Sequence, residues 1–318
     1  MTAEPAKIAK LDAEGLSLRS VSLWQITWRR LFKRKSAILG MVILGILILI
    51  AFTAPILAPY DPTLSMLDAN PPQNLERRSA PCIHLFGCPA DQPQHILGTD
   101  GNIRDEFSRL LYGARVSLWI GLSTVTFAIV IGTVLGALGG YFGGWIDNLI
   151  MRTMDVLLAF PSLLLAIAIV TVLGPGLTNA LLAIGIVSIP AYARVVRASV
   201  LSVREMDYVS ATRALGGNTF QILFRRILPN ALTPLIVQGT LGIATAILDA
   251  AALSFLGLGA QPPMAEWGSM LGAERNQVFT APHLVFYPGL AIMLTVLSFN
   301  LLGDGLRDAL DPRLAHVS

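Results

Sequence analysis

Six long apolar segments alternate with polar segments along the chain. They cover 37–57 and about 116–138, 156–173, 177–193, 231–258 and 284–303. Each segment is close to the roughly 20 residues that a helix needs to cross a hydrocarbon core. Largely apolar runs of this length predict membrane-spanning helices rather than strands. We therefore expect an all-α membrane protein with six transmembrane helices.

The polar segments predict how the chain is organised. We expect an N-terminal region at 1–36, a first transmembrane helix at 37–57, a proline-rich loop at 58–113, a membrane core at 114–306 that contains a polar loop at 201–230, and a tail at 307–318. The connection at 139–155 is short, so the spans on either side of it should be antiparallel.

Lysine and arginine are distributed unequally between the two sides of this arrangement. With the N-terminus inside, the inner segments hold 17 of these residues and the outer segments hold 6. Because cytoplasmic loops carry the excess of basic residues, this asymmetry predicts that both termini are cytoplasmic. The segments 1–36, 201–230 and 307–318 would then face the cytoplasm, and 58–113 would lie outside.

The composition supports a membrane protein and argues against a nucleic-acid partner. Hydrophobic residues make up 54% of the 318 residues and charged residues only 14%, with a mean hydropathy of +0.64. A soluble domain carries about 25% charged residues. The net charge of +3 comes from basic residues next to apolar spans, which indicates contact with membrane lipid rather than with nucleic acid.

The most amphipathic stretch downstream of residue 36 is 207–229, with the sequence DYVSATRALGGNTFQILFRRILP. Helical spacing places four residues on one face of a first short helix: Tyr208, Ala211, Thr212 and Leu215. Gly216 and Gly217 should end that helix, because glycine adopts the left-handed conformation of a helix C-terminus. Two amphipathic helices joined by a glycine elbow suggest a contact surface for another protein.

The second helix of this stretch should begin at Asn218 or Thr219, since either side chain can cap a helix N-terminus. Its expected apolar face consists of Phe220, Leu223, Phe224 and Ile227. Pro229 is expected to close the unit.

Several catalytic motifs are absent from the sequence. All four lysines lie at or before Lys35, and none follows a glycine, so the chain contains no phosphate-binding loop. It also lacks a His-Glu-x-x-His pair and a Gly-x-Ser-x-Gly elbow. If the protein uses ATP to move a solute, the hydrolysis must occur on a partner.

The segment 207–229 resembles the cytoplasmic loop of permease subunits in ABC importers. The family pattern is Glu-Ala-Ala, three residues, Gly, nine residues, Ile, one residue and Leu-Pro. Gly216 and the pair Leu228–Pro229 match this pattern at the family spacing. Two positions depart from it: residues 210–212 read Ser-Ala-Thr, and Arg226 replaces the isoleucine.

Three further blocks resemble one branch of these permeases, the C-type subunits of dipeptide, oligopeptide and nickel importers. They are GTDGNIRDEFSRLLYGARVSL at 98–118, MRTMDVLLAFPSLLLAI at 151–167 and DAAALSFLGLGAQPPMAEWGSMLG at 249–272. In the first block Ile103 replaces a usual glycine. In the third, Asp249 lies one position before the usual glutamate and should point elsewhere on its helix.

The resemblance implies a type I ABC importer permease fold and a non-catalytic role. In such importers a homologous B-type permease completes the pathway, two ATPase subunits bind ATP and Mg²⁺, and an extracytoplasmic substrate-binding protein delivers peptide. This chain itself would bind no cofactor. The residues expected to contact an ATPase are Asp207, Tyr208, Ala211, Ala214, Leu215, Gly216, Leu228 and Pro229.

Acidic residues and glycines in or beside the predicted spans can have either a structural or a functional role. Asp249 is an acid inside a predicted span, which suggests a role in the pathway, although it could instead face the helix bundle and only support packing. Gly132, Gly136 and Gly140 recur every four residues and predict close helix packing. Asp147 and Asp155 lie on either side of Arg152 and are expected to form interface charge.

Cys82 and Cys88 are the only cysteines, and both lie in the predicted outer loop. A disulfide would persist in the oxidising space outside, so we expect these residues to be bridged. A metal site that adds His84 and His95 is the alternative, but the spacing matches no usual zinc pattern and we expect no metal.

The function expected from these features is a permease subunit of an ATP-driven importer, most simply one for dipeptides or oligopeptides. The same architecture could import nickel chelates, glutathione or another small solute, because the binding protein selects the substrate. A secondary transporter is a further alternative, but the sequence shows no second copy of the blocks at 98–118 or 207–229.

Overall fold

The computed structural model describes residues 23–69, 75–89 and 91–310. The expected N-terminal region 1–36 and tail 307–318 therefore lie partly outside the described residues. The described chain is mainly helical, with a long irregular loop between α3 and α4. Its elements are α2 (Leu23–Leu31), α3 (Lys35–Leu57), η1 (His84–Phe86), α4 (Glu106–Phe142), α5 (Gly144–Leu158), α6 (Ser162–Leu173), α7 (Leu177–Arg204), α8 (Asp207–Ala214), η2 (Gln221–Ile227), α9 (Leu228–Ala231), α10 (Thr233–Phe255), α11 (Trp267–Glu274), η3 (Arg275–Gln277) and α12 (His283–Leu310).

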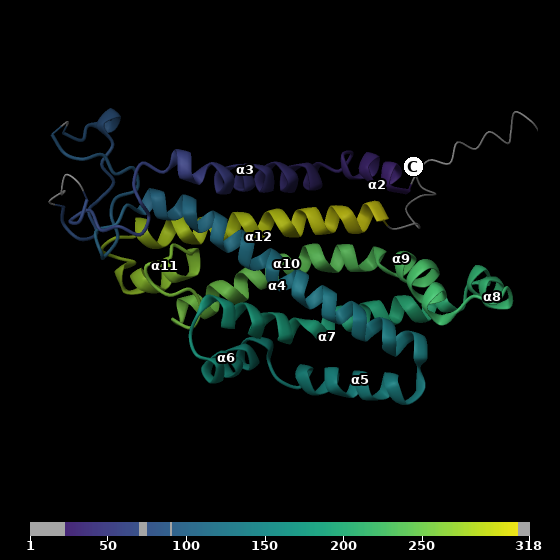
Figure 1. Cartoon of the computed structure of the whole chain (residues 1–318). Coiled ribbons are helices and arrows are strands. Elements are labelled where there is room, and N and C mark those ends of the chain that lie inside the picture. Colours follow the sequence, from purple (N-terminus) through teal and green to yellow (C-terminus); the bar gives the residue numbers. More distant parts are fainter. Residues whose placement is uncertain (1–22, 70–74, 90, 311–318) are drawn as a thin grey trace, which may run out of the picture.

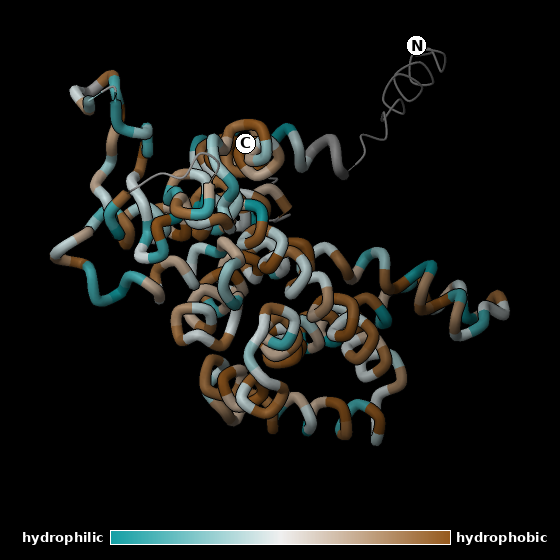
Figure 2. The backbone as a smooth tube through the Cα atoms, turned by 60° about the vertical axis from the view of Figure 1, so that its left-hand side comes forward, coloured by the Kyte–Doolittle hydropathy of each residue, from teal (hydrophilic) through white to brown (hydrophobic). Residues whose placement is uncertain are grey.

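Five long helices form the body of the molecule: α3, α4, α7, α10 and α12. In Figure 1 four of them run along the length of the molecule, and α4 crosses obliquely between them. Each is long and apolar enough to cross a membrane, and the bent pair α5 and α6 brings the number of candidate spans in the described chain to six. This result agrees with the six apolar segments of the sequence. The tube in Figure 2 is mostly brown, the apolar colour, along these helices and carries more teal in the loops at the ends.

The third span differs from the prediction, because it is broken and begins earlier. The segment 139–155, expected to be a short connection, contains the end of α4 and most of α5. Between α5 and α6 the chain bends by 91°. Pro161 explains the break, since the residue before a proline is disfavoured in the α conformation and the proline itself cannot donate a backbone hydrogen bond.

Glycine allows α4 and α7 to pack closely. A Cβ atom on Gly132 would lie 2.7 Å from Cβ of Tyr192, and one on Gly140 would lie 2.9 Å from the carbonyl oxygen of Arg197. Gly136 meets the same helix between them. The packing role predicted for these three glycines is therefore confirmed.

Two ion pairs connect α5 to α7. Asp147 pairs with Arg197 at 2.5 Å, and Asp155 pairs with Arg194 at 2.6 Å. The sequence pointed to Arg152 as the neighbouring charge, but the arginines that pair with these acids come from a helix about 40 to 50 residues away. The arginine partners could not be predicted from spacing along one helix, because the pairing depends on how α5 folds back against α7.

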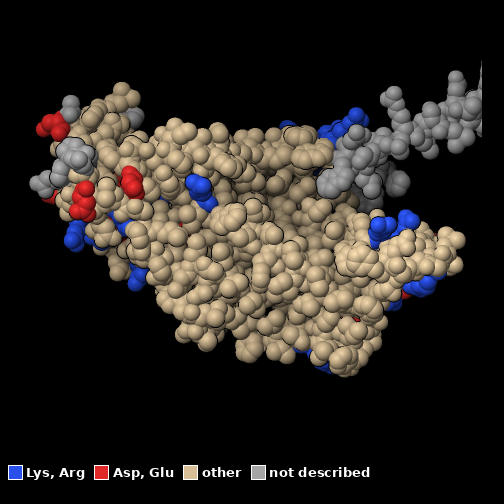
Figure 3. All heavy atoms as spheres, in the orientation of Figure 1, with Lys and Arg blue, Asp and Glu red and all other residues tan. Residues whose placement is uncertain are grey.

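The two ends of the bundle carry most of the charged side chains on the face shown in Figure 3, and a nearly uncharged band lies between them. One end holds α8 and α2, and the other holds α11 and the loop that joins α3 to α4 (Figure 1). We call the second region, residues 58–105 together with 256–282, the outer cap. The candidate functional residues lie at these two ends and on α10 between them.

Candidate functional site

The first short helix of the amphipathic loop is α8, and it forms where the sequence predicted it. Met206 precedes it in an extended conformation, and Asp207 occupies its first turn, where a negative charge is favoured by the helix dipole. Gly216 follows the helix with a φ of +82°, a conformation that suits glycine. The amide of Gly217 donates to the carbonyl of Thr212 at 3.0 Å, which completes the elbow.

Only one side chain of α8 is fully buried. Val209 is 0% exposed and anchors the helix to the rest of the loop. The opposite face points outward and includes most of the predicted contact residues: Asp207, Tyr208, Ala211, Ala214, Leu215 and Gly216. The small side chain of Ala211 lies near the centre of this outward face, so the helix backbone is accessible there.

The second arm of the loop is a π-helix, η2, rather than an ordinary α-helix. Asn218 caps it, because its Oδ1 atom accepts a hydrogen bond from the amide of Gln221 at 2.8 Å. The wider turn places residues five apart on one side. Ile222 and Ile227 are therefore both buried with Leu223.

The predicted apolar face of this arm is consequently wrong in part. Phe220 and Phe224 were expected on the same face as Leu223 and Ile227, but the two phenylalanines are exposed. Their rings pack against each other, with centroids 4.6 Å apart. A spacing argument based on 3.6 residues per turn could not find this register.

Pro229 was expected to end the pair of helices in this loop, but the helical chain continues through it. The chain continues from η2 into α9, and Pro229 occupies the first turn of that helix, where a missing amide hydrogen costs nothing. Pro229 is exposed and Leu228 is half-buried. Both therefore lie at the base of the loop, separated along the chain from the elbow at Gly216.

A small hydrogen-bond cluster joins the two arms at this base. The hydroxyl of Tyr208 donates to the carbonyl of Arg226 at 3.3 Å. The amide nitrogen of Asn230 donates to the Tyr208 hydroxyl at 3.1 Å and to the same carbonyl at 2.9 Å. Sequence reasoning missed Asn230, which follows Leu228–Pro229 directly as the last residue of the predicted loop 201–230 and was given no role.

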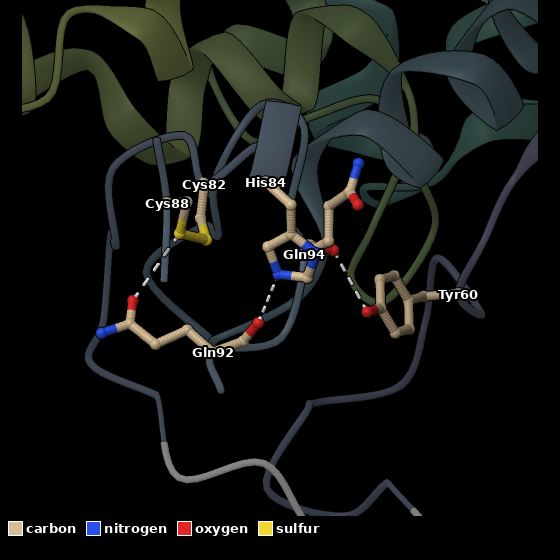
Figure 4. Close-up of a disulfide and its surroundings, with 6 residues drawn as sticks. All are labelled: Tyr60, Cys82, His84, Cys88, Gln92 and Gln94. Carbon is tan, nitrogen blue, oxygen red and sulfur yellow. Dashed lines mark hydrogen bonds between the residues drawn. A yellow bond between two sulfur atoms is a disulfide. The ribbon is translucent and has the colours of Figure 1, made fainter. Parts of the chain in front are cut away.

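The opposite end of the molecule, the outer cap, is held together by covalent and polar contacts. Cys82 and Cys88 are joined by a disulfide with Cα atoms 5.4 Å apart. Figure 4 shows His84 beside the bridge, with its Nε2 atom 2.8 Å from the carbonyl of Gln92. Among the described residues no three His, Cys, Asp or Glu side chains are placed to hold a metal ion.

Beneath the disulfide lies a buried network of ion pairs. Asp105 is fully buried, and its carboxylate lies 2.7 Å from Nδ1 of His95 and accepts hydrogen bonds from the amide and hydroxyl of Ser108. Asp100 pairs with Arg104 at 2.7 Å. These contacts cap the start of α4 and fix the loop to it.

The cap is also bound to α11. Arg78 pairs with Glu274 at 2.7 Å, and the amide of Gly101 donates to the other carboxylate oxygen of Glu274 at 2.8 Å. Glu266 caps α11 by accepting from the amides of Gly268 and Ser269. Burial raises the pKa of Glu266, and those two hydrogen bonds oppose the rise.

Comparisons with known proteins place this architecture in a family. Residues 128–316 match the family model described as "Binding-protein-dependent transport system inner membrane component", and residues 22–81 match "N-terminal TM domain of oligopeptide transport permease C". The chain belongs to this permease family. It is thus a multi-pass inner membrane component of a transport system.

Relatives and a solved structure agree with the family. The permease is 50% identical over 295 residues to the "Dipeptide transport system permease protein DppC" of Alkalihalophilus pseudofirmus, covering 93% of this chain and 91% of the relative. It is 46% identical to the "Glutathione transport system permease protein GsiD" of Pectobacterium atrosepticum, covering 92% and 91%. A chain of the inward-facing MetNI methionine ABC transporter matches with a TM-score of 0.52 at 19% identity, covering 64% of the permease and 97% of that chain. The type I ABC importer permease fold expected from the sequence is confirmed.

Asp249 lies in the last third of α10, on the side of the outer cap, and α11 packs against the nearby Ala251. Asp249 is half-buried in the chain, between the exposed Leu248 and the buried Ala250. No side chain or backbone group in the described residues forms a hydrogen bond or ion pair with its carboxylate. Asp147 and Asp155 contrast with it, since each of these acids is paired with an arginine.

Proposed function

We propose that the permease forms half of the translocation pathway of an ATP-driven importer and that its loop 201–230 couples this pathway to ATPase subunits. The outward face of α8 and its elbow supports the proposal most directly. Leu215 is 89% exposed and Phe220 is 69% exposed, although the hydrogen-bonded arms beneath them are well ordered by their contacts. Exposed apolar side chains on a folded projection are typical of a surface that another protein covers.

The partners follow from the family and from what this chain lacks. A homologous B-type permease would supply the other half of the pathway, and two ATPase subunits would bind ATP and Mg²⁺, since the sequence contains no phosphate-binding loop. An extracytoplasmic substrate-binding protein would deliver the solute to the outer cap. The family description, which refers to binding-protein-dependent transport, supports this last partner.

The orientation that fits these partners has both termini in the cytoplasm. The unequal distribution of lysine and arginine supports this orientation, since 17 lie in the segments on the cytoplasmic side and 6 in the segments on the other side. The loop 201–230 then lies where ATP is available. The disulfide of the outer cap lies on the opposite, oxidising side, where such a bond persists.

Di- and oligopeptides are the substrates that we propose for this importer. The relative from Alkalihalophilus pseudofirmus is named for dipeptide transport, and the permease is 50% identical to it. Glutathione is the second candidate, because the relative from Pectobacterium atrosepticum at 46% identity is named for it. Both solutes are short peptides with a free amino group, so the two candidates differ in detail rather than in chemical class.

The variant Ala211→Asp tests the coupling proposal. It places a charge at the centre of the outward face of α8, where a docked subunit would bury it without a partner. We expect at least a tenfold loss of ATPase subunits that copurify with the permease, since an unpaired charge in an interface costs on the order of 2 to 5 kcal/mol. ATP-dependent uptake into vesicles should fall with it.

Ser210→Asp is the matched control, because it adds the same charge to the same helix at the edge of the outward face. It should keep most of the bound ATPase and most of the uptake. The proposal would be wrong if Ala211→Asp transported at the native rate with its ATPase subunits still bound.

A further inference from the structure

The helix α10 has one buried face and one accessible face. Its buried side consists of small and aliphatic residues that pack against α4, α7 and α12: Leu235, Gly239, Ala246, Ala250 and Leu253. The residues on the other side are half-buried or exposed in the chain. The accessible face therefore has to meet lipid, another subunit or a water-filled space.

This accessible face is divided lengthwise into two different stripes. One stripe is apolar and contains Leu248 and Phe255, which are seven residues apart and exposed. Leu241, seven residues before Leu248, is half-buried and packs against Gly303 of α12. The other is polar or small and contains Gln238, Thr245, Asp249 and Ala252, at spacings of seven, four and three. Gly242 falls on the same line, but it lies against the hydroxyl of Tyr192 on α7 and is not open there. Residues with this spacing lie along one line of a helix. An apolar stripe suits hydrocarbon, whereas a line that contains an amide, a hydroxyl and a carboxylate suits a space that polar molecules enter.

Asp249 is the one charged residue of α10, and nothing in the described chain satisfies it. An isolated charge within a membrane-spanning helix is costly, so such residues face the interior of a bundle or a water-filled cavity and acquire a partner. The other two acids of the bundle considered above have arginine partners at 2.5 and 2.6 Å. A partner for Asp249 therefore has to come from outside the residues that the structure describes.

We propose that Asp249 binds the protonated amino group of a peptide during its passage through the importer. This inference rests on the proposed import of peptides. A peptide amino terminus has a pKa of about 8 and carries a positive charge at neutral pH, so its charge is complementary to the carboxylate.

The neighbouring polar residues fit the rest of such a solute. Thr245 lies one turn from Asp249 on the same stripe, a rise of about 6 Å along the helix. An extended dipeptide is about 7 Å long, so its amino group can reach Asp249 while its carboxyl end lies beside Thr245. Gln238 continues the stripe by two further turns for a longer peptide. The polar stripe would thus contact the backbone, which all peptides share, and leave side chains to the binding protein.

The test uses the complete importer in proteoliposomes, with both permeases, the ATPases and the binding protein. Uptake is measured for a dipeptide and for its deamino analogue, in which hydrogen replaces the ammonium group. Loading of the isolated binding protein with each solute is measured separately, so that uptake is compared at equal loading. We expect the native importer to prefer the ammonium form by roughly tenfold or more, as a hydrogen bond to a charged group supports.

In Asp249→Asn this preference should fall to near equality, through slower uptake of the ammonium form. Asp304→Asn is the control, because Asp304 is an exposed, unpaired acid near the end of α12 and its loss should leave the preference unchanged.

An unchanged preference in Asp249→Asn would overturn the inference, as would a native importer that does not discriminate. Failure of Asp249→Asn to assemble with the partner permease would also overturn it, by making Asp249 an interface residue. A failure of the proposed function is distinct, since the native importer would then show no ATP-driven uptake of either solute.

Discussion

The outer cap buries charged side chains, whereas the coupling loop buries only apolar ones. In the cap, charged groups are buried and paired: Asp105 is fully buried with His95, and Glu274 is nearly so with Arg78. In the loop, large apolar groups are exposed, with Leu215 and Phe220 on the surface. The cap pairs these buried charges within the chain, and it too exposes apolar side chains such as Leu85 and Phe279. The loop differs because it has no buried charge to pair.

This difference separates residues that maintain the fold from residues that make external contacts. Removing a partner from a buried ion pair leaves a buried charge and costs several kcal/mol. Changing an exposed side chain usually changes stability by less than about 0.5 kcal/mol, even where it abolishes binding. The contrast therefore predicts large stability effects in the cap and small ones in the loop.

Asp105→Ala should give the largest loss of stability. It removes the carboxylate that contacts His95 and the amide and hydroxyl of Ser108, so these groups lose their buried acceptor. We expect a loss of about 3 to 5 kcal/mol, visible as a lower midpoint in thermal unfolding of the purified permease.

Asp91→Ala is the control for this variant, because Asp91 is an exposed acid of the same cap with no ion pair. Its midpoint should match that of the native permease. Equal midpoints for Asp105→Ala and the native protein would show that the buried network does not stabilise the cap.

Cys82→Ser should have an intermediate effect. The bridge to Cys88 closes a loop with a sequence separation of only 6, so a chain-entropy estimate gives about 2 kcal/mol. Treatment of the native permease with a reducing agent should lower the midpoint to the same value. Mass spectrometry of non-reduced peptides provides the independent check, and two alkylatable thiols in protein from an oxidising compartment would contradict the bridge.

The smallest effect on stability should come from Ala211→Asp in the loop. Ala211 is exposed, and it lies opposite the anchoring side chain of Val209. We expect the unfolding midpoint of the isolated permease to stay within the range of about 0.5 kcal/mol that surface substitutions cause. A large loss of stability would instead place Ala211 inside the fold, and the loss of ATPase binding would then have a trivial cause.

The sequence predicted those features that depend on local pattern. Apolar runs of sufficient length located the spans, and the Gly216–Gly217 pair located the elbow, since a positive φ is readily adopted only by glycine. The spacing of Gly132, Gly136 and Gly140 can be recognised in the sequence of a single helix, and it therefore predicted close packing.

Features that depend on a second segment could not be predicted in this way. The arginine partners of Asp147 and Asp155 lie on α7, and their positions follow from the 91° bend after α5. The pairing of Glu274 with Arg78 in the cap joins residues that are 196 positions apart, so no local pattern predicts it. The π-helical register that buries Ile222 is a departure from helical periodicity itself.

The accessibility of the coupling loop in the assembled importer tests the central claim most directly. In a background with Cys82→Ser and Cys88→Ser, the variants Leu215→Cys and Leu85→Cys place one thiol on the loop and one on the cap, at sites that are 89% and 87% exposed. Labelling with a maleimide is measured for the isolated permease and again after the ATPase subunits are bound. We predict that both thiols react in the isolated permease, and that ATPase binding slows labelling at position 215 by at least tenfold without changing it at position 85. Equal labelling at position 215 with and without bound ATPase would contradict the account.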